Sequence, residues 1–266
     1  KLAKEVNYRG LGTFEFLIDP NDQSFYFMEA NARLQVEHTV TEEVLGVDLV
    51  KAQIAIAHGQ SLAELGLTQA EIAEPNGYAV QARINLETLN ADGSIKPGGG
   101  TLSQYVPPSG PGLRVDSYGY SGYRTNPAFD SLVAKVIAHV PGGTFPETLK
   151  RLDAALGSFD LVGVPSTIGL HRALLDLSDV RDYAVHTRFI DQNAETLSAK
   201  AAMTARAADP LAVLDQAAAT TGSIGQSALP AGMAAVNAPM QGTLVSLSIS
   251  PGDAVSAGTI VAIMEA

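Results

Sequence analysis

The chain has 266 residues, 46% of them hydrophobic, which is enough for one large domain or two to three smaller ones. The net charge of −11 comes from 17 basic and 28 acidic residues, and the scattered basic residues argue against a nucleic-acid-binding or anionic-membrane surface. The absence of cysteine excludes disulfides and thiolate metal sites and fits a cytoplasmic protein. No apolar run has the length of a membrane span, and no signal peptide is expected.

Both ends of the chain look cut. The first residues, KLAKEV, read as the last turns of a helix already under way, and the final GTIVAIMEA is a strand-like run without a cap. We therefore expect an internal piece of a longer polypeptide.

The first predicted elements are two strands at 12–18 and 24–30, which the turn-rich sequence DPNDQ would join into a β-hairpin. The segment 38–59 then changes to a helical period, which predicts a helix that starts with a capping box at Thr39 and Glu42.

From Gly77 to about Asn193, strands and helices mix. Strands are predicted at GYAVQARINLE, TLSQYVPP and FDSLVAKVIAHV, and helices at FPETLKRLDAALGSF and STIGLHRALLDL. This mixture predicts an α+β unit.

The segment 194–235 is rich in Ala, Ser, Thr and Gly, which predicts a linker with some helix at its start. From Asn237 the pattern changes again. GTLVSLSI alternates as a strand, PGD turns the chain, and GTIVAIMEA is a further strand.

Five polar side chains alternate with small or apolar ones after the second predicted strand begins. They are Glu29, Asn31, Arg33, Gln35 and Glu37, and they share one face for as long as the chain stays extended. Such a face needs a reason, because it mixes both charges.

Glu15 gives part of that reason. If the hairpin turn is centred on Asp22, Glu15 falls opposite Glu29, whereas a shift of one residue would separate their faces. Facing carboxylates repel unless a cation lies between them, and a hard divalent ion, helped by Asn31, would reconcile the pair. Magnesium that bridges to nucleotide phosphates is the usual case. The alternative is a solvated polar face on an edge strand.

The second half of the polar face suits a small anion. Arg33 offers a planar fork for an oxyanion, Gln35 can add a neutral hydrogen bond, and Glu37 is a candidate general base. The alternative is an Arg–Glu surface pair of little energetic value. These residues alone leave both interpretations open.

Four other features are interpreted as structural. The sequence KPGGGT at 96–101 lacks the Walker lysine-hydroxyl pair and is expected to be a turn. His38 would face away from Glu37 on an ideal strand, which favours packing or capping. Asp130 and Lys135 are expected to have a structural or interface role.

Several strings resemble the C-terminal half of biotin carboxylase, an ATP-grasp enzyme: RGLGTFEFL, FYFMEANARLQVEHTVTEEVLGVDLV, AVQARIN and FDSLVAKVI. The resemblance covers most of residues 1–193. It implies three groups of site residues: metal ligands Glu15, Glu29 and Asn31; bicarbonate-binding Arg33, Gln35 and the backbone of Val36; and catalytic Glu37, Arg83 and Arg33.

Within that resemblance, Glu37 matches the base that deprotonates bicarbonate. Arg83 resembles the arginine that stabilises the biotin enolate, although Arg33 could fill that role. The implied cofactors are ATP, Mg²⁺ or Mn²⁺, and biotin. ATP would activate bicarbonate to carboxyphosphate, whose CO2 is transferred to biotin. The family's nucleotide-gripping lysine and glycine-rich lid would precede Lys1, so this chain is expected to be inactive alone.

The C-terminal string NAPMQGTLVSLSISPGDAVSAGTIVAIMEA resembles the first half of a biotinyl carrier domain. The lysine that carries biotin in that family is expected just beyond Ala266, so no biotinylated lysine lies in this chain. A lipoyl domain shares the fold, but MEA favours biotin. A generic small β-barrel is the remaining alternative.

The expected fold class is therefore α+β, followed by a truncated all-β biotinyl/lipoyl-like half-barrel. The predicted domains are the C-terminal part of an ATP-grasp domain at 1–60, a biotin carboxylase C-terminal domain at 61–193, a flexible Ala-rich linker at 194–235, and the truncated carrier at 236–266.

This order resembles multifunctional acetyl-, propionyl- or long-chain acyl-CoA carboxylases. It implies bicarbonate, ATP, a biotinyl carrier domain and a carboxyltransferase domain or subunit as partners, in a homo-oligomer without nucleic acid or membrane. The alternatives are an ATP-grasp carboxylate–amine ligase, a pyruvate or urea carboxylase as the parent enzyme, and a non-enzymatic scaffold or carrier.

Overall fold

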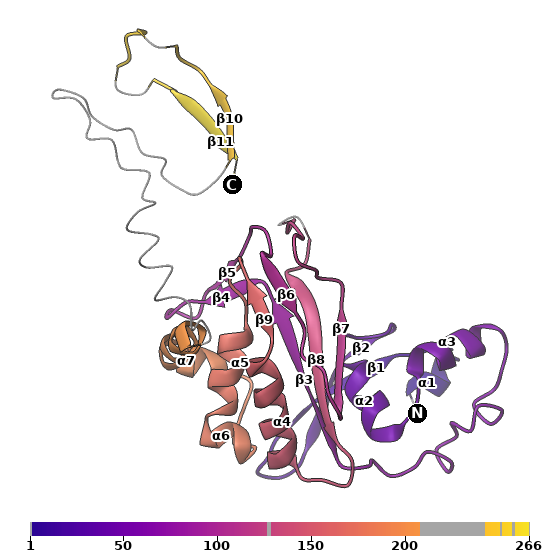
Figure 1. The fold of residues 1–266 in the computed structure, drawn as a ribbon. Helices are drawn as coiled ribbons and strands as arrows, with labels where there is room; N and C mark the ends of the chain where they lie inside the picture. The colour runs from indigo at the N-terminus through magenta and orange to yellow at the C-terminus, as the bar shows by residue number, and fades with distance from the viewer. Residues whose placement is uncertain (1, 127–128, 208–242, 251, 257–258, 266) are drawn as a thin grey trace. The chain divides into compact units, whose positions relative to one another are not determined.

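The computed structural model describes residues 2–126, 129–207, 243–250, 252–256 and 259–265. The chain divides into two compact units, Lys1–Pro210 and Leu211–Ala266, and each is described by itself (Figure 1). Among the described residues, no helix combines the length and the apolar character that crossing a membrane requires.

The first unit begins with a short helix and the predicted hairpin. Its first elements are α1 (Leu2–Glu5), β1 (Thr13–Ile18), β2 (Phe25–Asn31), α2 (His38–Leu45) and α3 (Leu49–Ala57). Strands β1 and β2 pair antiparallel. Their turn is closed by carboxylates that accept backbone N–H groups two residues on, Asp19 from Asn21 and Asp22 from Ser24, each at 2.9 Å.

The helix predicted over 38–59 is in fact two helices. Gly46 ends α2 in the left-handed region, with φ 66°, and its N–H reaches the carbonyl of Glu42. Asp48 then caps α3, because its side chain accepts the N–H of Lys51 at 2.7 Å. A glycine after one helix and an aspartate before the next are the signals that the hydrophobic period concealed.

The predicted capping box at Thr39 and Glu42 is wrong. The N-cap of α2 is Glu37, and its side chain makes no capping hydrogen bond. Thr39 and Glu42 are instead buried: the Thr39 hydroxyl donates to the Gln81 amide oxygen, and the Glu42 carboxylate accepts from the Leu49 N–H. Both side chains therefore form contacts with other parts of the fold and do not cap the helix.

A three-stranded antiparallel sheet forms the centre of the following region, in the order β3 (Tyr78–Asn85), β8 (Leu132–Val140), β7 (Leu113–Ser117). Two small antiparallel pairs flank it: β4 (Glu87–Leu89) with β5 (Ile95–Pro97), and β6 (Gln104–Val106) with β9 (Asp160–Val162). The helices are α4 (Phe145–Gly157), α5 (Ile168–Leu175), α6 (Ser178–Arg181) and α7 (Phe189–Ala207). The α+β character predicted from the sequence is confirmed.

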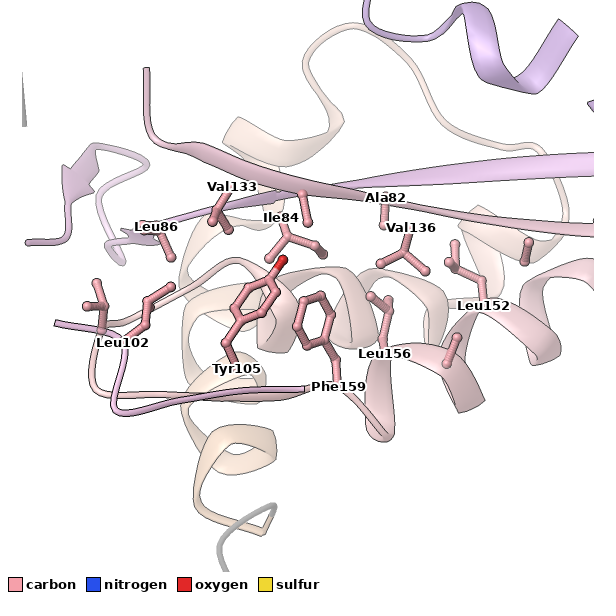
Figure 2. Packing of buried hydrophobic residues seen from close by; sticks show 14 residues of the cluster. Ala82, Ile84, Leu86, Leu102, Tyr105, Val133, Val136, Leu152, Leu156 and Phe159 are labelled. Carbon is pink, nitrogen blue, oxygen red and sulfur yellow. The ribbon is translucent and has the colours of Figure 1, made fainter. Parts of the chain in front are cut away.

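The main core lies between this sheet and α4 (Figure 2). Ile84 and Val136 from the sheet are fully buried, and Leu152 and Leu156 from α4 pack against them. The predicted α4 begins with a capping box in which Thr144 and Glu147 exchange hydrogen bonds. Side-chain alternation on β3 and β8 thus places the apolar residues toward α4.

The opposite face of the same sheet is polar and carries α2. Gln81, Arg83, Lys135 and Asp116 lie on this face, because Arg83 and Asp116 are both in register with Lys135 on the central strand β8. The sheet therefore has an apolar face that holds the core and a polar face that meets the segment after β2.

Helix α7 runs into the segment predicted as a linker. Ala194 and Leu197 are buried with Ala173 of α5 and Leu89 of β4, so the start of that segment packs within the first unit. The remainder of the predicted linker, from 208 onward, lies outside the described residues.

In the second unit, β10 (Thr243–Leu247) and β11 (Ala262–Glu265) pair antiparallel, as the strand pattern predicts. Their register shifts between Leu244 and Ser246. Val245 and Leu247 are exposed, so within the described residues the pair offers uncovered apolar side chains.

Candidate active site

The hairpin brings three of the predicted site residues together. Glu15 is in register with Glu29, which confirms the predicted pairing, and Thr13 pairs with Asn31. The Asn31 Nδ2 donates to Oε1 of Glu15 and to Oε1 of Glu29, each at 2.9 Å. One amide group thus holds two carboxylates close together at the end of the hairpin.

This donor set fits a hard divalent cation. Carboxylate and amide oxygens are the ligands that Mg²⁺ prefers, and Mg²⁺ usually takes only one or two carboxylates from the protein. Across the described ranges no three His, Cys, Asp or Glu side chains form a metal-binding group, so the hairpin would contribute two carboxylates at most. Phosphate oxygens and water would complete the coordination of such an ion.

The expectation that Arg33, Gln35 and Glu37 continue the strand alternation is wrong. Strand β2 ends at Asn31, and residues 32–37 bend and turn into α2. The chain has to change direction here, because α2 packs on the polar face of the β3–β8–β7 sheet. The positions of these three side chains therefore follow from the turn and not from the pleat.

The turn nevertheless returns Gln35 to the carboxylates. Its Nε2 donates to Oε1 of Glu15 at 3.1 Å, next to the bond from Asn31. Its Oε1 is buried and has no hydrogen-bond partner among the described residues. A buried acceptor without a partner costs about 1–3 kcal/mol, so this amide is positioned to gain from a bound hydrogen-bond donor.

Arg33 remains exposed beside this cluster. Its guanidinium donates to the Leu34 carbonyl at 3.2 Å, and its Nη2 lies 3.5 Å from the Asn31 amide oxygen. Of the ion pairs among the described residues, none joins Arg33 to Glu37. The alternative, a surface ion pair between Arg33 and Glu37, is therefore not present in the described part of the chain. The Arg33 guanidinium is accessible to an anion from solution.

Glu37 lies at the start of α2, and its residue is exposed. Since its carboxylate does not cap the helix, it can serve as an acceptor for a proton or a donor group of a ligand. The adjacent His38 has the packing role expected for it. Its Nδ1 lies 2.7 Å from the Gln35 carbonyl, and its Nε2 lies 3.8 Å from the Glu42 carboxylate.

Arg83 lies on β3, on the polar face that receives the turn, and is exposed. Its backbone is held from α5 and the residue before that helix: the carbonyl accepts from the Thr167 hydroxyl at 3.0 Å and lies 2.6 Å from Nε2 of His171. Burial lowers the pKa of His171, although the hydrogen bond to Arg83 opposes that effect. The ring is therefore neutral at neutral pH, with its proton on Nε2 facing the carbonyl.

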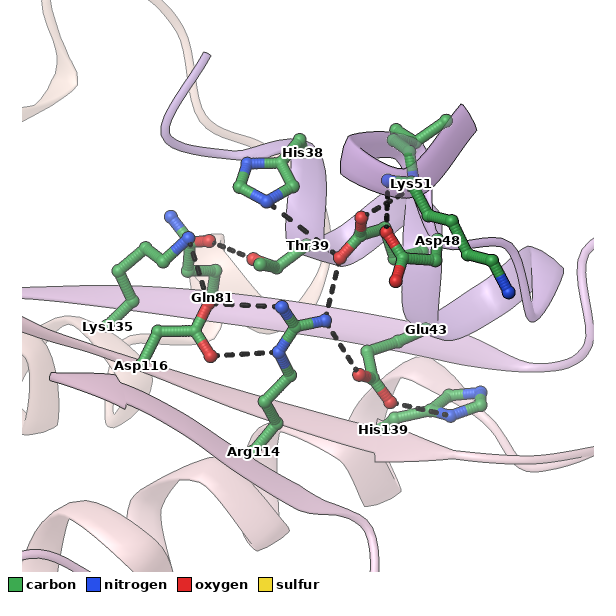
Figure 3. Close-up of polar contacts among 12 residues, drawn as sticks. His38, Thr39, Glu43, Asp48, Lys51, Gln81, Arg114, Asp116, Lys135 and His139 are labelled. Carbon is green, nitrogen blue, oxygen red and sulfur yellow. Dashed lines mark hydrogen bonds and ion pairs between the residues drawn. The ribbon is translucent and has the colours of Figure 1, made fainter. Parts of the chain in front are cut away.

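A network of charges that sequence reasoning missed joins α2 to the sheet (Figure 3). Arg114 contacts Glu42 at 2.7 Å, Glu43 at 3.4 Å and Asp116 at 2.9 Å. The hydrogen bond with Asp116 raises the pKa of Arg114. No spacing rule could pair residues 42 and 114, because β7 and α2 meet only in the folded chain.

Lys135 connects this network to the predicted site. Its Nζ lies 3.2 Å from the Asp116 carboxylate and donates to the Val36 carbonyl at 3.2 Å. Burial raises the pKa of Asp116, but hydrogen bonds from Arg114 and Lys135 outweigh it and lower the pKa overall. The carboxylate is therefore charged at neutral pH and can hold both cations.

A hollow of about 670 Å³ lies among α4, α5, α6 and α7, away from these residues. Its charged lining is largely paired internally: Arg172 with Asp153 at 2.8 Å, and Lys200 with Asp176 at 2.8 Å. It contains none of the predicted site residues, so volume alone does not locate the chemistry of this protein.

Two stretches of the chain match models of known protein families. Residues 81–192 match the Biotin carboxylase C-terminal domain family, and residues 1–65 match the family described as carbamoyl-phosphate synthase L chain, ATP binding domain.

Individual proteins agree with this assignment. Biotin carboxylase 1 of Bacillus subtilis (strain 168) is 44% identical over 191 residues, which are 72% of this chain and 41% of that protein. The mitochondrial pyruvate carboxylase of Homo sapiens is 42% identical over 196 residues, which are 73% of this chain and 16% of that protein. The chain thus spans less than half the length of each of these relatives.

Solved structures extend the likeness to three dimensions. The biotin carboxylase domain of a single-chain bacterial carboxylase superposes with a TM-score of 0.69 at 44% identity, over 76% of this chain and 45% of that one. A single-chain, multi-domain long-chain acyl-CoA carboxylase gives a TM-score of 0.69 at 38% identity, over 100% of this chain and 26% of that one. The first part of this chain therefore matches the biotin carboxylase type of ATP-dependent carboxylase domain.

Proposed function

We propose that this chain is part of an enzyme that carboxylates carrier-bound biotin with ATP and bicarbonate, the first half-reaction of a biotin-dependent acyl-CoA carboxylase. The observation that carries the proposal is the convergence of Glu15, Glu29, Asn31 and Gln35 at the end of the β1–β2 hairpin, next to the exposed Arg33. The arrangement places two carboxylates that could bind a metal ion next to the Arg33 guanidinium, which could bind an anion.

In this proposal Glu15 and Glu29 bind Mg²⁺ or Mn²⁺, and Asn31 keeps the two carboxylates together. The metal would neutralise the phosphate charge of ATP as the terminal phosphoryl group is transferred. A solved relative supports this choice: the biotin carboxylase domain of 2-oxoglutarate carboxylase from Hydrogenobacter thermophilus, in complex with MgADP and bicarbonate, is 37% identical with a TM-score of 0.67.

Bicarbonate would bind to Arg33, Gln35 and the backbone of Val36. The guanidinium supplies a two-pronged donor for the anion, and the Gln35 amide, whose buried Oε1 has no partner among the described residues, lies beside that position. Glu37 would take the bicarbonate proton as the bicarbonate oxygen attacks the terminal phosphate of ATP. Its exposed carboxylate is compatible with that role.

Arg83 would face the biotin ring and stabilise the negative charge that develops on it when its nitrogen loses a proton. Its location on the polar face of the sheet, with its backbone carbonyl held by Thr167 and His171, supports this role. Arg33 is the competing candidate for the same role.

The acceptor is proposed to be an acyl-CoA. The alignment with the long-chain acyl-CoA carboxylase extends across the whole chain and so includes the β10–β11 unit, which supports a biotinyl carrier at the C-terminal end. The alignment with a complete multifunctional pyruvate carboxylase from Rhizobium etli covers 74% of this chain, so pyruvate remains the second candidate.

The test of the first half-reaction is Glu37→Gln in the full-length protein. Because general acid–base catalysis contributes about 10²–10⁴ in rate, we expect bicarbonate-dependent ATP cleavage to fall at least about a hundredfold. Steady-state kinetics with varied bicarbonate measure this. Unchanged turnover in the Gln variant would exclude Glu37 as the base and would contradict the bicarbonate activation proposed for this chain.

A further inference from the structure

Lys135 is the charged residue that links the two halves of the site. It lies at the centre of β8, and its side chain is only 12% exposed. Its Nζ has two oxygen partners, the Asp116 carboxylate and the Val36 carbonyl, each at 3.2 Å. A buried ammonium group is stable only when it is paired in this way.

The carbonyl that Lys135 holds belongs to the peptide bond between Val36 and Glu37. A hydrogen bond to that oxygen fixes the peptide plane, since the six atoms of a peptide unit are rigid. The same plane sets the direction in which the backbone of Glu37 enters α2. Lys135 therefore acts on the turn immediately before the candidate base.

Lys135 also lies beside Arg83 in the sheet. The two residues are in register on neighbouring strands β8 and β3, and side chains in register share a face of the sheet. Asp116 completes the row on the other side, because it is in register with Lys135 on β7. Lys135 thus lies in the same cross-strand row as Arg83 and also contacts the peptide bond that precedes Glu37.

A purely structural role for Lys135 is the competing explanation. Helix α2 is already fixed to the sheet without it: Arg114 binds Glu42 and Glu43, and the Thr39 hydroxyl donates to Gln81. Those contacts all reach the helix itself. Lys135 instead contacts the turn before the helix, at the peptide that leads into Glu37.

We propose that Lys135, held by Asp116, is a positioning residue that orients the Val36–Glu37 peptide, so that Glu37 faces the bound bicarbonate. This inference rests on the proposed function, because it assigns the turn to bicarbonate. Its consequence is specific: loss of Lys135 weakens bicarbonate use and leaves the hairpin carboxylates, which would bind metal and nucleotide, in place.

The test compares Lys135→Met with Lys135→Arg in the full-length protein, with initial rates of ATP cleavage at varied bicarbonate and varied ATP. Misplacement of a reacting group by about 1 Å costs up to about 10²-fold. We expect the Met variant to raise the KM for bicarbonate between about tenfold and about a hundredfold. The KM for ATP should change less than about twofold, and the Arg variant should recover most of the bicarbonate affinity.

Two controls separate positioning from general damage. Lys150→Met removes an exposed lysine of α4 and should leave both constants unchanged. Glu43→Gln weakens the α2 network at Arg114 and His139 but leaves the Lys135 contacts intact, and should not alter the KM for bicarbonate. An increase in Glu43→Gln as large as in Lys135→Met would overturn the inference.

Asp116→Asn decides the case in which Lys135→Met does not fold. It removes the charge that holds Lys135 but keeps a hydrogen-bonding side chain, so we expect a smaller increase in the KM for bicarbonate. An unchanged KM in this variant would refute positioning by Lys135. If Glu37→Gln is inactive while the Lys135 and Asp116 variants behave like wild type, the inference fails and the proposed function stands; if Glu37→Gln is active, the proposed function itself fails.

Discussion

At the hairpin, two acidic residues share one hydrogen-bonding partner, Asn31. Glu15 and Glu29 would repel each other across the hairpin, and Asn31 relieves that repulsion by donating to both. Gln35 adds a further bond to Glu15 from the turn. The two carboxylates are thus held close together and form an oxygen-rich position that a cation could occupy.

This arrangement predicts that Glu29→Gln weakens metal binding without unfolding the hairpin. Loss of even an outer-shell partner typically reduces metal affinity about 10–100-fold, so loss of a direct ligand should reduce it at least about tenfold. Titration of the full-length protein with Mn²⁺, followed by the paramagnetic signal of the free ion, measures the affinity directly. The same variant should need more Mg²⁺ to reach half-maximal ATP cleavage.

The matched control is Glu195→Gln, which removes an exposed carboxylate from α7. It should bind Mn²⁺ like the unaltered protein. Equal affinity in Glu29→Gln and Glu195→Gln would mean that the hairpin carboxylates are a polar surface and not a metal site.

How far the sequence predicts these positions depends on the range of the interaction. The pairing of Glu15 with Glu29 follows from strand alternation and a short turn, both local, and the structure confirms it. The locations of Arg33, Gln35 and Glu37 do not follow, because β2 ends at Asn31 once α2 docks on a sheet built from residues far along the chain.

At the scale of elements, the same division appears in the helices. The apolar period over 38–59 predicts helix correctly, but it cannot count helices, because Val47 and Val50 continue the pattern across a break. Gly46 and Asp48 cause the break: Gly46 ends α2, and Asp48 caps α3. It matters for the site, since it lets α2 lie on the sheet independently of α3.

We therefore predict that Gly46→Ala destabilises the protein more than Gly46→Asn. At φ 66° an L-residue is strained even though nothing lies within 4 Å of the added Cβ. The cost for Ala should be about 1 kcal/mol, whereas Asn tolerates this conformation better. Urea unfolding followed by circular dichroism compares the two midpoints. Equal midpoints would show that the left-handed end of α2 is not what separates it from α3.

At the scale of the whole molecule, sequence patterns locate β3, β8, α4 and α5 because each is built from apolar residues with a clear period, but they do not predict β7, the third strand of the sheet. They do not reveal the cross-links among Glu42, Arg114, Asp116 and Lys135, since charged residues carry no period that identifies their partners. These ionic contacts join the region of the ATP-binding match to the region of the carboxylase match. Prediction is thus strongest within each region and weakest at the junction where the proposed chemistry takes place.

The two units of the chain make a final prediction together. If the first unit activates bicarbonate and the second is the start of a biotinyl carrier, both belong to one polypeptide, and the tether between them keeps biotin at a high local concentration. We then expect biotin on a lysine shortly after Ala266 in the full-length protein. A streptavidin blot with mass mapping of the labelled peptide measures this.

The outcome distinguishes the candidate functions. Biotin at that lysine would support a carboxylase that carries its own carrier, and assays with acyl-CoA and with pyruvate would then separate the two acceptors. A full-length protein without biotin would detach the β10–β11 unit from the proposal, because its strands would then belong to another small β-domain. The hairpin cluster of Glu15, Glu29 and Asn31 would still predict metal-dependent ATP chemistry, and the carrier would have to be supplied by a separate protein.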